Sequence, residues 1–207
     1  MKFSIIISLL FTIFSCFAQD NFKPVQQDLK DVFQGKGNQL TSIKSDFVQE
    51  KHLVYLSSTV VSKGKFWYQK QDKLRWEYTE PFKYKVVLNN GKVKISDENS
   101  TQVYNKKPNK TFDQLNQILS KSVNGTLIGD PAYSFKILES TDQYLVKIFP
   151  KDEEMKQIFS GIDLYFFKKI MAVSKVKMTE KGGDTITITF KNKEVNIPLD
   201  QSIFKIE

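Results

Sequence analysis

The strongest alternation of apolar and polar positions in this chain surrounds Trp76. Leu74, Trp76 and Tyr78 fall on one face of an extended segment, and the charged residues between them fall on the other. This pattern predicts a strand with one buried and one solvated face. Residues 63–70 predict a neighbouring strand, and Asn90-Gly91 predicts a hairpin turn because both residue types tolerate positive φ. We therefore predict an antiparallel meander of consecutive strands with one aromatic face.

Two other segments carry apolar residues at helical spacing. Residues 25–33 predict an amphipathic helix that Gly35 and Gly37 end. Thr111 is a suitable N-cap for a second helix. The apolar stripe of this second helix consists of Phe112, Leu115, Ile118 and Leu119. A helix this short needs a surface to cover, because it is marginally stable alone.

Many further segments have the composition of β-strands, since β-branched and aromatic residues alternate in them and turn residues separate them. These strands are predicted at residues 40–53, 55–61, 83–88, 133–138, 143–149, 162–167, 172–178 and 184–190. Because the strands are many and the helices few, we predict an α+β fold that is mainly β. It consists of a curved antiparallel sheet that forms an incomplete β-barrel, covered by a few amphipathic helices as a lid. Residues 19–207 are expected to form a single domain.

The N-terminal segment reads as a cleavable signal peptide at residues 1–18. Lys2 supplies a positive start, residues 3–14 are mostly apolar, and Cys16-Phe17-Ala18 fits a cleavage site with small residues. The apolar run is too short to span a bilayer. Cleavage before Gln19 predicts an exported protein. The segment before Cys16 also loosely resembles the box that precedes a lipidated cysteine, so lipidation of Cys16 stays open as an alternative.

Charge and composition restrict the partners. The chain carries a formal net charge of +8, and such a balance suits nucleic acid, acidic lipid head groups or anionic envelope polymers. Arg75 is the only arginine. Since arginine is the side chain that most often reads bases, and since the chain is expected to be exported, we expect no nucleic-acid partner.

Catalytic motifs are scarce. His52 is the only histidine and Cys16 the only cysteine, which excludes an ordinary Ser-His or Cys-His site unless His52 alone serves it, and excludes a His-rich zinc site. The acidic run at residues 152–154 predicts the start of a helix or a loop rather than a cation site. Paired carboxylates of a glycoside hydrolase stay open. We expect no enzymatic activity, no metal and no cofactor.

Several short motifs, taken in order along the chain, resemble the family of periplasmic carriers of outer-membrane lipoproteins (LolA-like). They are Phe47-x-Gln49, Gly64-x-Phe66, Leu74-Arg75-Trp76-Glu77-Tyr78, Pro81, Asn90-Gly91-Lys92, Gln102-Val103, Gly182-Gly183 and Phe204. The resemblance implies an incompletely closed barrel with a helical lid over a hydrophobic cavity. The cavity would shelter acyl chains, whose return to water costs about 0.8 kcal/mol per methylene group.

The resemblance also implies site residues. The expected acyl-binding residues are Phe47, Phe66, Leu74, Trp76, Tyr78, Val86, Leu88, Phe112, Leu115, Ile118 and Leu119. In the family an Arg-Pro pair precedes the Trp strand, and its arginine helps to hold the lid closed. Here that position is Lys70, which lacks the planar fork of arginine. We therefore expect a weaker lid latch at Lys70, or one supplied by Arg75 or by another group.

The implied partners are acylated lipoproteins, an inner-membrane ABC transporter complex that releases them, and an outer-membrane acceptor if one exists. The carrier itself is expected to be a monomer. Two alternatives from other classes stay open, namely an envelope module on the same fold that binds lipid or glycolipid or senses stress, and an envelope hydrolase. For any single aromatic residue of the meander, ordinary core packing is also an open interpretation.

Overall fold

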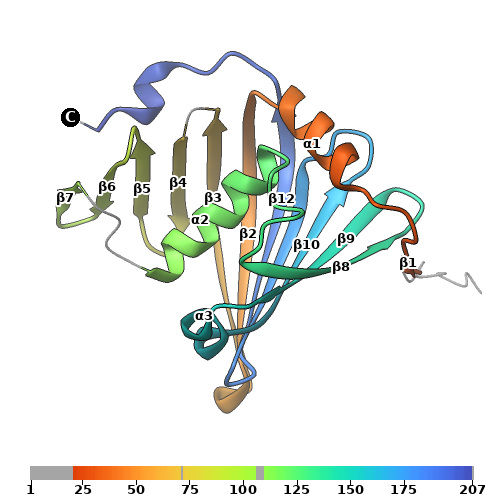
Figure 1. The fold of residues 1–207 in the computed structure, drawn as a ribbon. Helices are drawn as coiled ribbons and strands as arrows, with labels where there is room; N and C mark the ends of the chain where they lie inside the picture. Colours follow the sequence, from red (N-terminus) through yellow and green to blue (C-terminus); the bar gives the residue numbers. More distant parts are fainter. Residues whose placement is uncertain (1–20, 71, 106–109, 207) are drawn as a thin grey trace, which may run out of the picture.

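The computed structural model of the chain describes residues 21–206 except 71 and 106–109, and it leaves the side chains of residues 110–116 undescribed. The predicted signal peptide, including Cys16, lies outside the described residues. Within them the chain forms one twelve-stranded antiparallel sheet with α-helices on it. The sheet is strongly curved and does not close into a barrel (Figure 1). This architecture confirms the predicted fold class.

The strand order in the sheet is β1-β8-β9-β10-β11-β12-β2-β3-β4-β5-β6-β7. The strands are β1 (Lys23–Pro24), β2 (Ser42–Leu53), β3 (Ser58–Gln69), β4 (Lys73–Glu80), β5 (Tyr84–Asn89), β6 (Lys92–Asp97), β7 (Thr101–Tyr104), β8 (Tyr133–Glu139), β9 (Gln143–Pro150), β10 (Phe159–Phe167), β11 (Val173–Glu180) and β12 (Thr185–Val195). The α-helices are α1 (Lys30–Gln39), α2 (Lys110–Val123) and α3 (Glu153–Ile158), and the 3₁₀ turns are η1 (Val54–Leu56) and η2 (Gln201–Phe204). Strands that follow one another in sequence are neighbours, except β1 and β2, which α1 separates, and β7 and β8, which α2 separates. The pairing of β12 with β2 joins the two halves of the sheet.

The aromatic meander forms as predicted. Trp76 of β4 lies opposite Phe66 of β3 on one side and Val86 of β5 on the other. Asn90 and Gly91 both have positive φ, 48° and 77°, in the two-residue turn between β5 and β6. One boundary differs from the prediction, because the two strands expected at residues 55–61 and 63–70 are the single long strand β3.

The first helix was predicted too early in the chain. Instead of residues 25–33 it spans Lys30–Gln39, and the backbone N–H of Val25 donates to the carbonyl of Ile137 in β8 at 3.1 Å. The apolar spacing of residues 25–33 was therefore misread, since Val25 belongs to an extended segment at the sheet edge. Gly35 and Gly37 lie inside the helix rather than after it.

Close packing explains the buried glycine of α1. A Cβ atom built on Gly37 would lie 2.4 Å from the backbone nitrogen of Gly125, just beyond α2, whereas a Cβ on Gly35 would meet nothing within 4 Å. Gly37 thus lets the C-terminal end of α1 touch the segment that follows α2. This contact joins the two helices that cover the concave face, α1 and α2 (Figure 1).

The two glycines of α1 form a matched pair for mutation. We expect Gly37→Ala to lower the free energy of unfolding by about 1–3 kcal/mol, because the new methyl group separates α1 from the end of α2. Gly35→Ala should raise it by up to about 1 kcal/mol through helix propensity alone. Urea unfolding followed by circular dichroism measures both. Equal effects of the two substitutions would contradict the packing role of Gly37.

The acidic run at residues 152–154 starts a helix, which is one of the two predicted alternatives. The Asp152 carboxylate accepts a hydrogen bond from the backbone N–H of Met155 at 3.0 Å and caps α3. Met155 is buried, so the cap fixes a helix that packs on the core. The run therefore has a structural role at the edge of β9 and β10.

The outer face of the meander has its own small core. Val87, Phe204 and Ile206 are buried there, with Trp67 packed against them. The two tryptophans therefore lie on opposite faces of the sheet, since Trp76 belongs to the main core cluster. The C-terminal segment with η2 covers this outer face, and the helices α1 and α2 cover the inner one.

Candidate functional site

The concave face of the sheet carries a cluster of aromatic rings at its centre. The ring of Phe47 in β2 lies 4.5 Å from that of Trp76 and 5.2 Å from that of Tyr78, measured between centroids. Phe66 of β3 lies 5.4 Å from Trp76, and Phe190 of β12 lies 6.0 Å from it. Period-two alternation on four adjacent strands places these rings together, because residues opposite one another in the register share a face.

The other predicted sheet residues lie on the same face. Leu74 pairs with Leu88, and Trp76 pairs with Val86. All of them are buried, as are Phe47 and Phe66. Tyr78 is half-buried, and its hydroxyl donates to Oε1 of Gln49 at 2.9 Å. Burial raises the pKa of Tyr78, so the phenol stays protonated and can act only as a neutral polar group.

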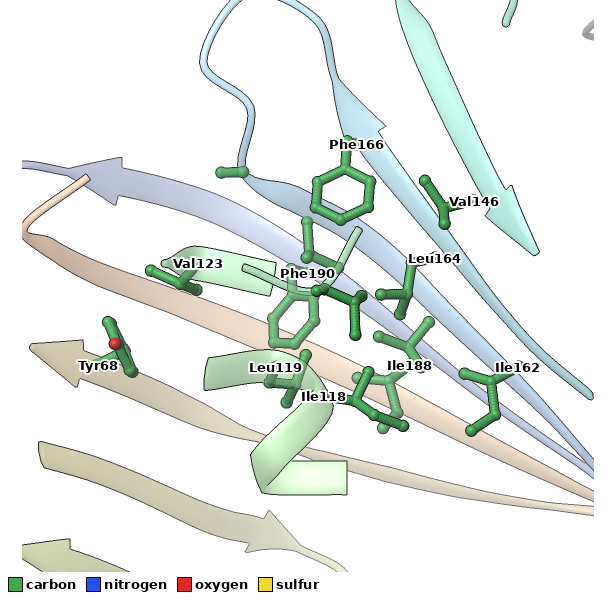
Figure 2. Close-up of a cluster of buried hydrophobic side chains, with 14 of the residues drawn as sticks. Tyr68, Ile118, Leu119, Val123, Val146, Ile162, Leu164, Phe166, Ile188 and Phe190 are labelled. Atoms are coloured by element: carbon green, nitrogen blue, oxygen red, sulfur yellow. The ribbon is translucent and has the colours of Figure 1, made fainter. Parts of the chain in front are cut away.

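Helix α2 lies across this concave face. Ile118 and Leu119 are 0% and 3% exposed, and Figure 2 shows both side chains directed from the helix toward Phe190 and Ile188 of β12. Val123 continues the same apolar stripe one turn further on. Phe112 and Leu115 belong to α2, but their side chains lie outside the described part of the structure. The structure thus brings the second half of the predicted stripe onto the sheet.

The described interface between α2 and the sheet is tightly packed. A cavity of about 10 Å³ remains there, which is about the room that one water molecule requires. Its lining consists of Ile43, Phe66, Leu119, Val123, Val173, Phe190 and Lys193. An acyl chain needs far more space than this. It could enter at this place only if α2 moved away from the sheet.

Lys70 binds α1 rather than α2. Its ammonium group donates to the carbonyl oxygen of Asn38 at 2.6 Å, in the last turn of α1. A cation at this position stabilises the helix terminus through both the hydrogen bond and the helix dipole. The side chain makes no hydrogen bond to the described part of α2. Its predicted role as a lid latch would therefore act through α1.

Arg75 lies on the outer face. Its guanidinium group donates to the Glu77 carboxylate at 2.6 and 3.0 Å and to the carbonyl oxygen of Ile203 at 3.3 Å. It also lies 5.1 Å from the centroid of the Trp67 ring. The structure thus places Arg75 against the C-terminal segment, on the side of the sheet opposite α2.

Residues that sequence reasoning missed hold the C-terminal end of α2. Lys121 donates to Asp130 at 2.5 Å, and the hydroxyl of Tyr68 donates to Asn124 at 3.3 Å. Burial alone would raise the pKa of Asp130, but hydrogen bonds from Lys121 and from the backbone N–H of Ala132 outweigh it and lower this pKa. From the sequence, Asn124-Gly125 was predicted only to end the helix. The contacts of Asn124 and Gly125 could not be predicted, because their partners are distant in the chain.

Among the residues that the structure describes, no group of three or more His, Cys, Asp or Glu side chains could hold a metal ion. Nδ1 of His52 lies 3.3 Å from the hydroxyl of Thr59 on an exposed part of the β2–β3 hairpin, far along the strands from the aromatic cluster. As for membrane spans, none of the helices described is both long and apolar enough to form one.

Two proteins named as outer-membrane lipoprotein carriers are similar to this chain in sequence. The outer-membrane lipoprotein carrier protein of Methylococcus capsulatus is 28% identical over 149 residues, which cover 70% of this chain and 66%, just under two thirds, of that relative. The protein of the same name from Pseudoalteromonas translucida is 24% identical over 200 residues, covering 96% of this chain and 90% of the relative.

Solved structures with the same fold are more distant. A structure of the Pseudomonas aeruginosa MucA/MucB complex matches with a TM-score of 0.53 at 15% identity, covering 86% of this chain and 60% of that one. An uncharacterised conserved protein from Thermus thermophilus matches with a TM-score of 0.51 at 9% identity, covering 84% and 90%. The sequence model of the family described as outer membrane lipoprotein carrier protein LolA matches residues 38–207. The chain therefore belongs to the LolA family of outer membrane lipoprotein carrier proteins.

Proposed function

We propose that this protein is a periplasmic carrier that shelters the acyl chains of lipoproteins and moves them from the inner to the outer membrane. The observation that supports it most is the position of α2, whose apolar stripe packs on a concave sheet face lined by Phe47, Phe66 and Trp76. Family membership supports the same role. An apolar, non-directional surface suits a carrier, because it binds many acyl chains and still releases them to a better acceptor.

The apolar contacts also provide the energy for such a cycle. Each methylene group that leaves water contributes about 0.8 kcal/mol, so a few buried acyl chains can offset the loss of the contacts between α2 and the sheet. A ligand shifts this equilibrium only if it binds the open form better than the closed one. The closed form leaves about 10 Å³ in the described interface. Acyl chains therefore favour the open form.

The opening motion that we propose is a pivot of α2 about its C-terminal end. Two polar pairs hold this end of α2 to its surroundings, Lys121–Asp130 and Tyr68–Asn124. Gly125 follows with φ of 69° and packs against Gly37 and the carbonyl of Phe33. The hydrogen bond of Lys70 to Asn38 connects α1 to the end of β3 beside this pivot, so Lys70 would keep α1 in place while α2 moves.

The experiment that tests carriage compares an acylated lipoprotein with its unacylated form. The purified protein is incubated with inner-membrane vesicles that hold the acylated lipoprotein and an active release transporter, and the soluble fraction is analysed by size exclusion. We expect a one-to-one complex with the acylated lipoprotein only, and transfer of its cargo to outer-membrane vesicles. Binding of the unacylated form with equal affinity would contradict acyl recognition.

The same experiment distinguishes the alternatives. A complex that forms but never delivers its cargo to outer-membrane vesicles would indicate an envelope module that binds lipid or senses stress without shuttling. Cleavage of the lipoprotein or of a lipid during incubation, detected by mass spectrometry, would indicate the hydrolase. Delivery of intact cargo is the outcome that the carrier role requires.

A further inference from the structure

Lys193 places a cationic group in the apolar interior beneath α2. Its ammonium nitrogen is buried and has no hydrogen-bond partner among the described residues. The ammonium nitrogen lies over two aromatic rings, 5.3 Å from the centroid of Phe167 and 5.6 Å from that of Phe190. Lys193 also lines the small cavity under Leu119. A buried ammonium group without an acceptor is unusual, because desolvation of a charge is costly unless the charge is paired.

A bulge in β12 directs this side chain inward. Phe190 faces the concave side, so regular alternation would turn Lys193 outward. The pairing of β12 with β2 shifts register between Lys191 and Glu194, and Asn192 adopts a positive φ of 50°. The extra residue reverses the alternation and brings Lys193 to the inner face. Because the bulge places the charged end of Lys193 in an apolar cavity, we expect that charge to have a function.

Among the described residues that line the cavity, none offers this lysine a negative charge. Its described neighbours in the cavity are Ile43, Phe66, Leu119, Val123, Val173 and Phe190, all apolar. The nearest acidic residues along the two strands are already engaged elsewhere, Glu194 with Lys44 at 2.7 Å and Asp46 with Asn192 at 2.8 Å. Burial lowers the pKa of Lys193 to about 8. The side chain is therefore still mainly an ammonium ion at neutral pH.

We infer that Lys193 is a head-group subsite, whose ammonium group binds the anionic head of a single-chain acyl amphiphile while the chain lies between α2 and the aromatic face. An oxyanion would give the ammonium the acceptor that it lacks, in a low-dielectric site where such a pair is strong. The candidate ligands share one feature, which is a carboxylate or phosphate group at the end of a single apolar chain. This inference rests on the same cavity as the proposed carrier function but concerns free amphiphiles instead of protein-bound acyl chains.

Ligands of equal chain length test the subsite at pH 7. Palmitate, palmitoyl lysophosphatidate and hexadecanol are titrated below their aggregation limits into protein that carries Trp67→Phe, so that Trp76 is the sole reporter of emission. We expect palmitate or the lysophosphatidate to bind about ten-fold or more tightly than hexadecanol, because a hydrogen bond to a charged group contributes about 1.5–3 kcal/mol. The tighter of the two anions identifies the source of the head group.

Three substitutions isolate the charge. Lys193→Met keeps the length of the side chain and should reduce anion affinity about ten-fold or more while leaving hexadecanol binding unchanged. Lys193→Arg should retain anion binding. The control Lys191→Met removes the same charge from the exposed neighbour on β12 and should change neither. A rise in the thermal midpoint of Lys193→Met is expected and shows that this variant is folded.

Two results would overturn the inference. One is equal affinity of the unsubstituted protein for palmitate, lysophosphatidate and hexadecanol, and the other is unchanged anion binding by Lys193→Met. Failure of all three ligands to bind would overturn it as well. None of these outcomes affects the lipoprotein-transfer experiment, because that experiment measures the delivery of protein cargo. The head-group subsite and the carrier function can therefore be refuted independently of each other.

Discussion

Replacement of Ile118 by aspartate is expected to detach α2 from the sheet. Ile118 is fully buried against the concave face, and a carboxylate in this position would have to be desolvated without a partner. This costs about 3 kcal/mol or more, and the substitution also removes the apolar contact between Ile118 and the sheet. We therefore expect an exposed aromatic face, measured as a large increase in the fluorescence of an added apolar dye.

The control for this experiment is Ile118→Met, which keeps an apolar side chain of similar volume and should cost less than about 1.5 kcal/mol. Dye binding by this variant should match that of the unsubstituted protein. Far-UV circular dichroism should show the sheet intact in both. If Ile118→Asp bound no more dye than Ile118→Met, α2 would not be the element that closes the site.

Truncation of Trp76 to alanine is expected to have the largest effect on stability among the aromatic residues. Trp76 is 3% exposed and packs against the rings of Phe47, Phe66, Tyr78 and Phe190. The loss of its apolar contacts together with the cavity that remains should lower the free energy of unfolding by about 3–5 kcal/mol. Urea unfolding at neutral pH measures the change.

Trp67→Ala is the matched comparison, because Trp67 lies on the opposite face of the adjacent strand and is only half-buried. It loses its contacts with Arg75 and the C-terminal segment, and a smaller decrease is expected. The two variants also separate stability from ligand binding, since Trp76 alone faces the proposed acyl site. A greater loss with Trp67→Ala would mean that the outer cluster stabilises the sheet more than the inner one.

Local sequence was sufficient for most of the sheet. Period-two alternation and turn residues are properties of adjacent positions, so β4, β5 and the Asn90-Gly91 turn were predicted within one or two residues. The concave residues followed from the same alternation, because strands in register present their inward positions together. The family was also visible, since its motifs lie along these strands in order.

Contacts between distant segments decided the rest. The spacing of residues 25–33 is compatible with a helix, but the sheet edge at β8 provides hydrogen bonds that draw Val25 into extended structure. From the sequence, Gly37 was expected to end the helix. Glycine is needed there because Gly125, 88 positions further along the chain, packs against it. Local propensity is weak enough that such tertiary contacts override it.

Three basic side chains show the same division between local sequence and tertiary structure. The sequence determined that Lys70, Arg75 and Lys193 are cations, but a long flexible side chain can reach acceptors in many directions, so only the fold decided their partners. Lys70 holds α1, and Arg75 holds the C-terminal segment on the outer face. Lys193 points inward because a bulge reverses the alternation of β12, and a register shift between strands is a property of their pairing that neither strand carries alone.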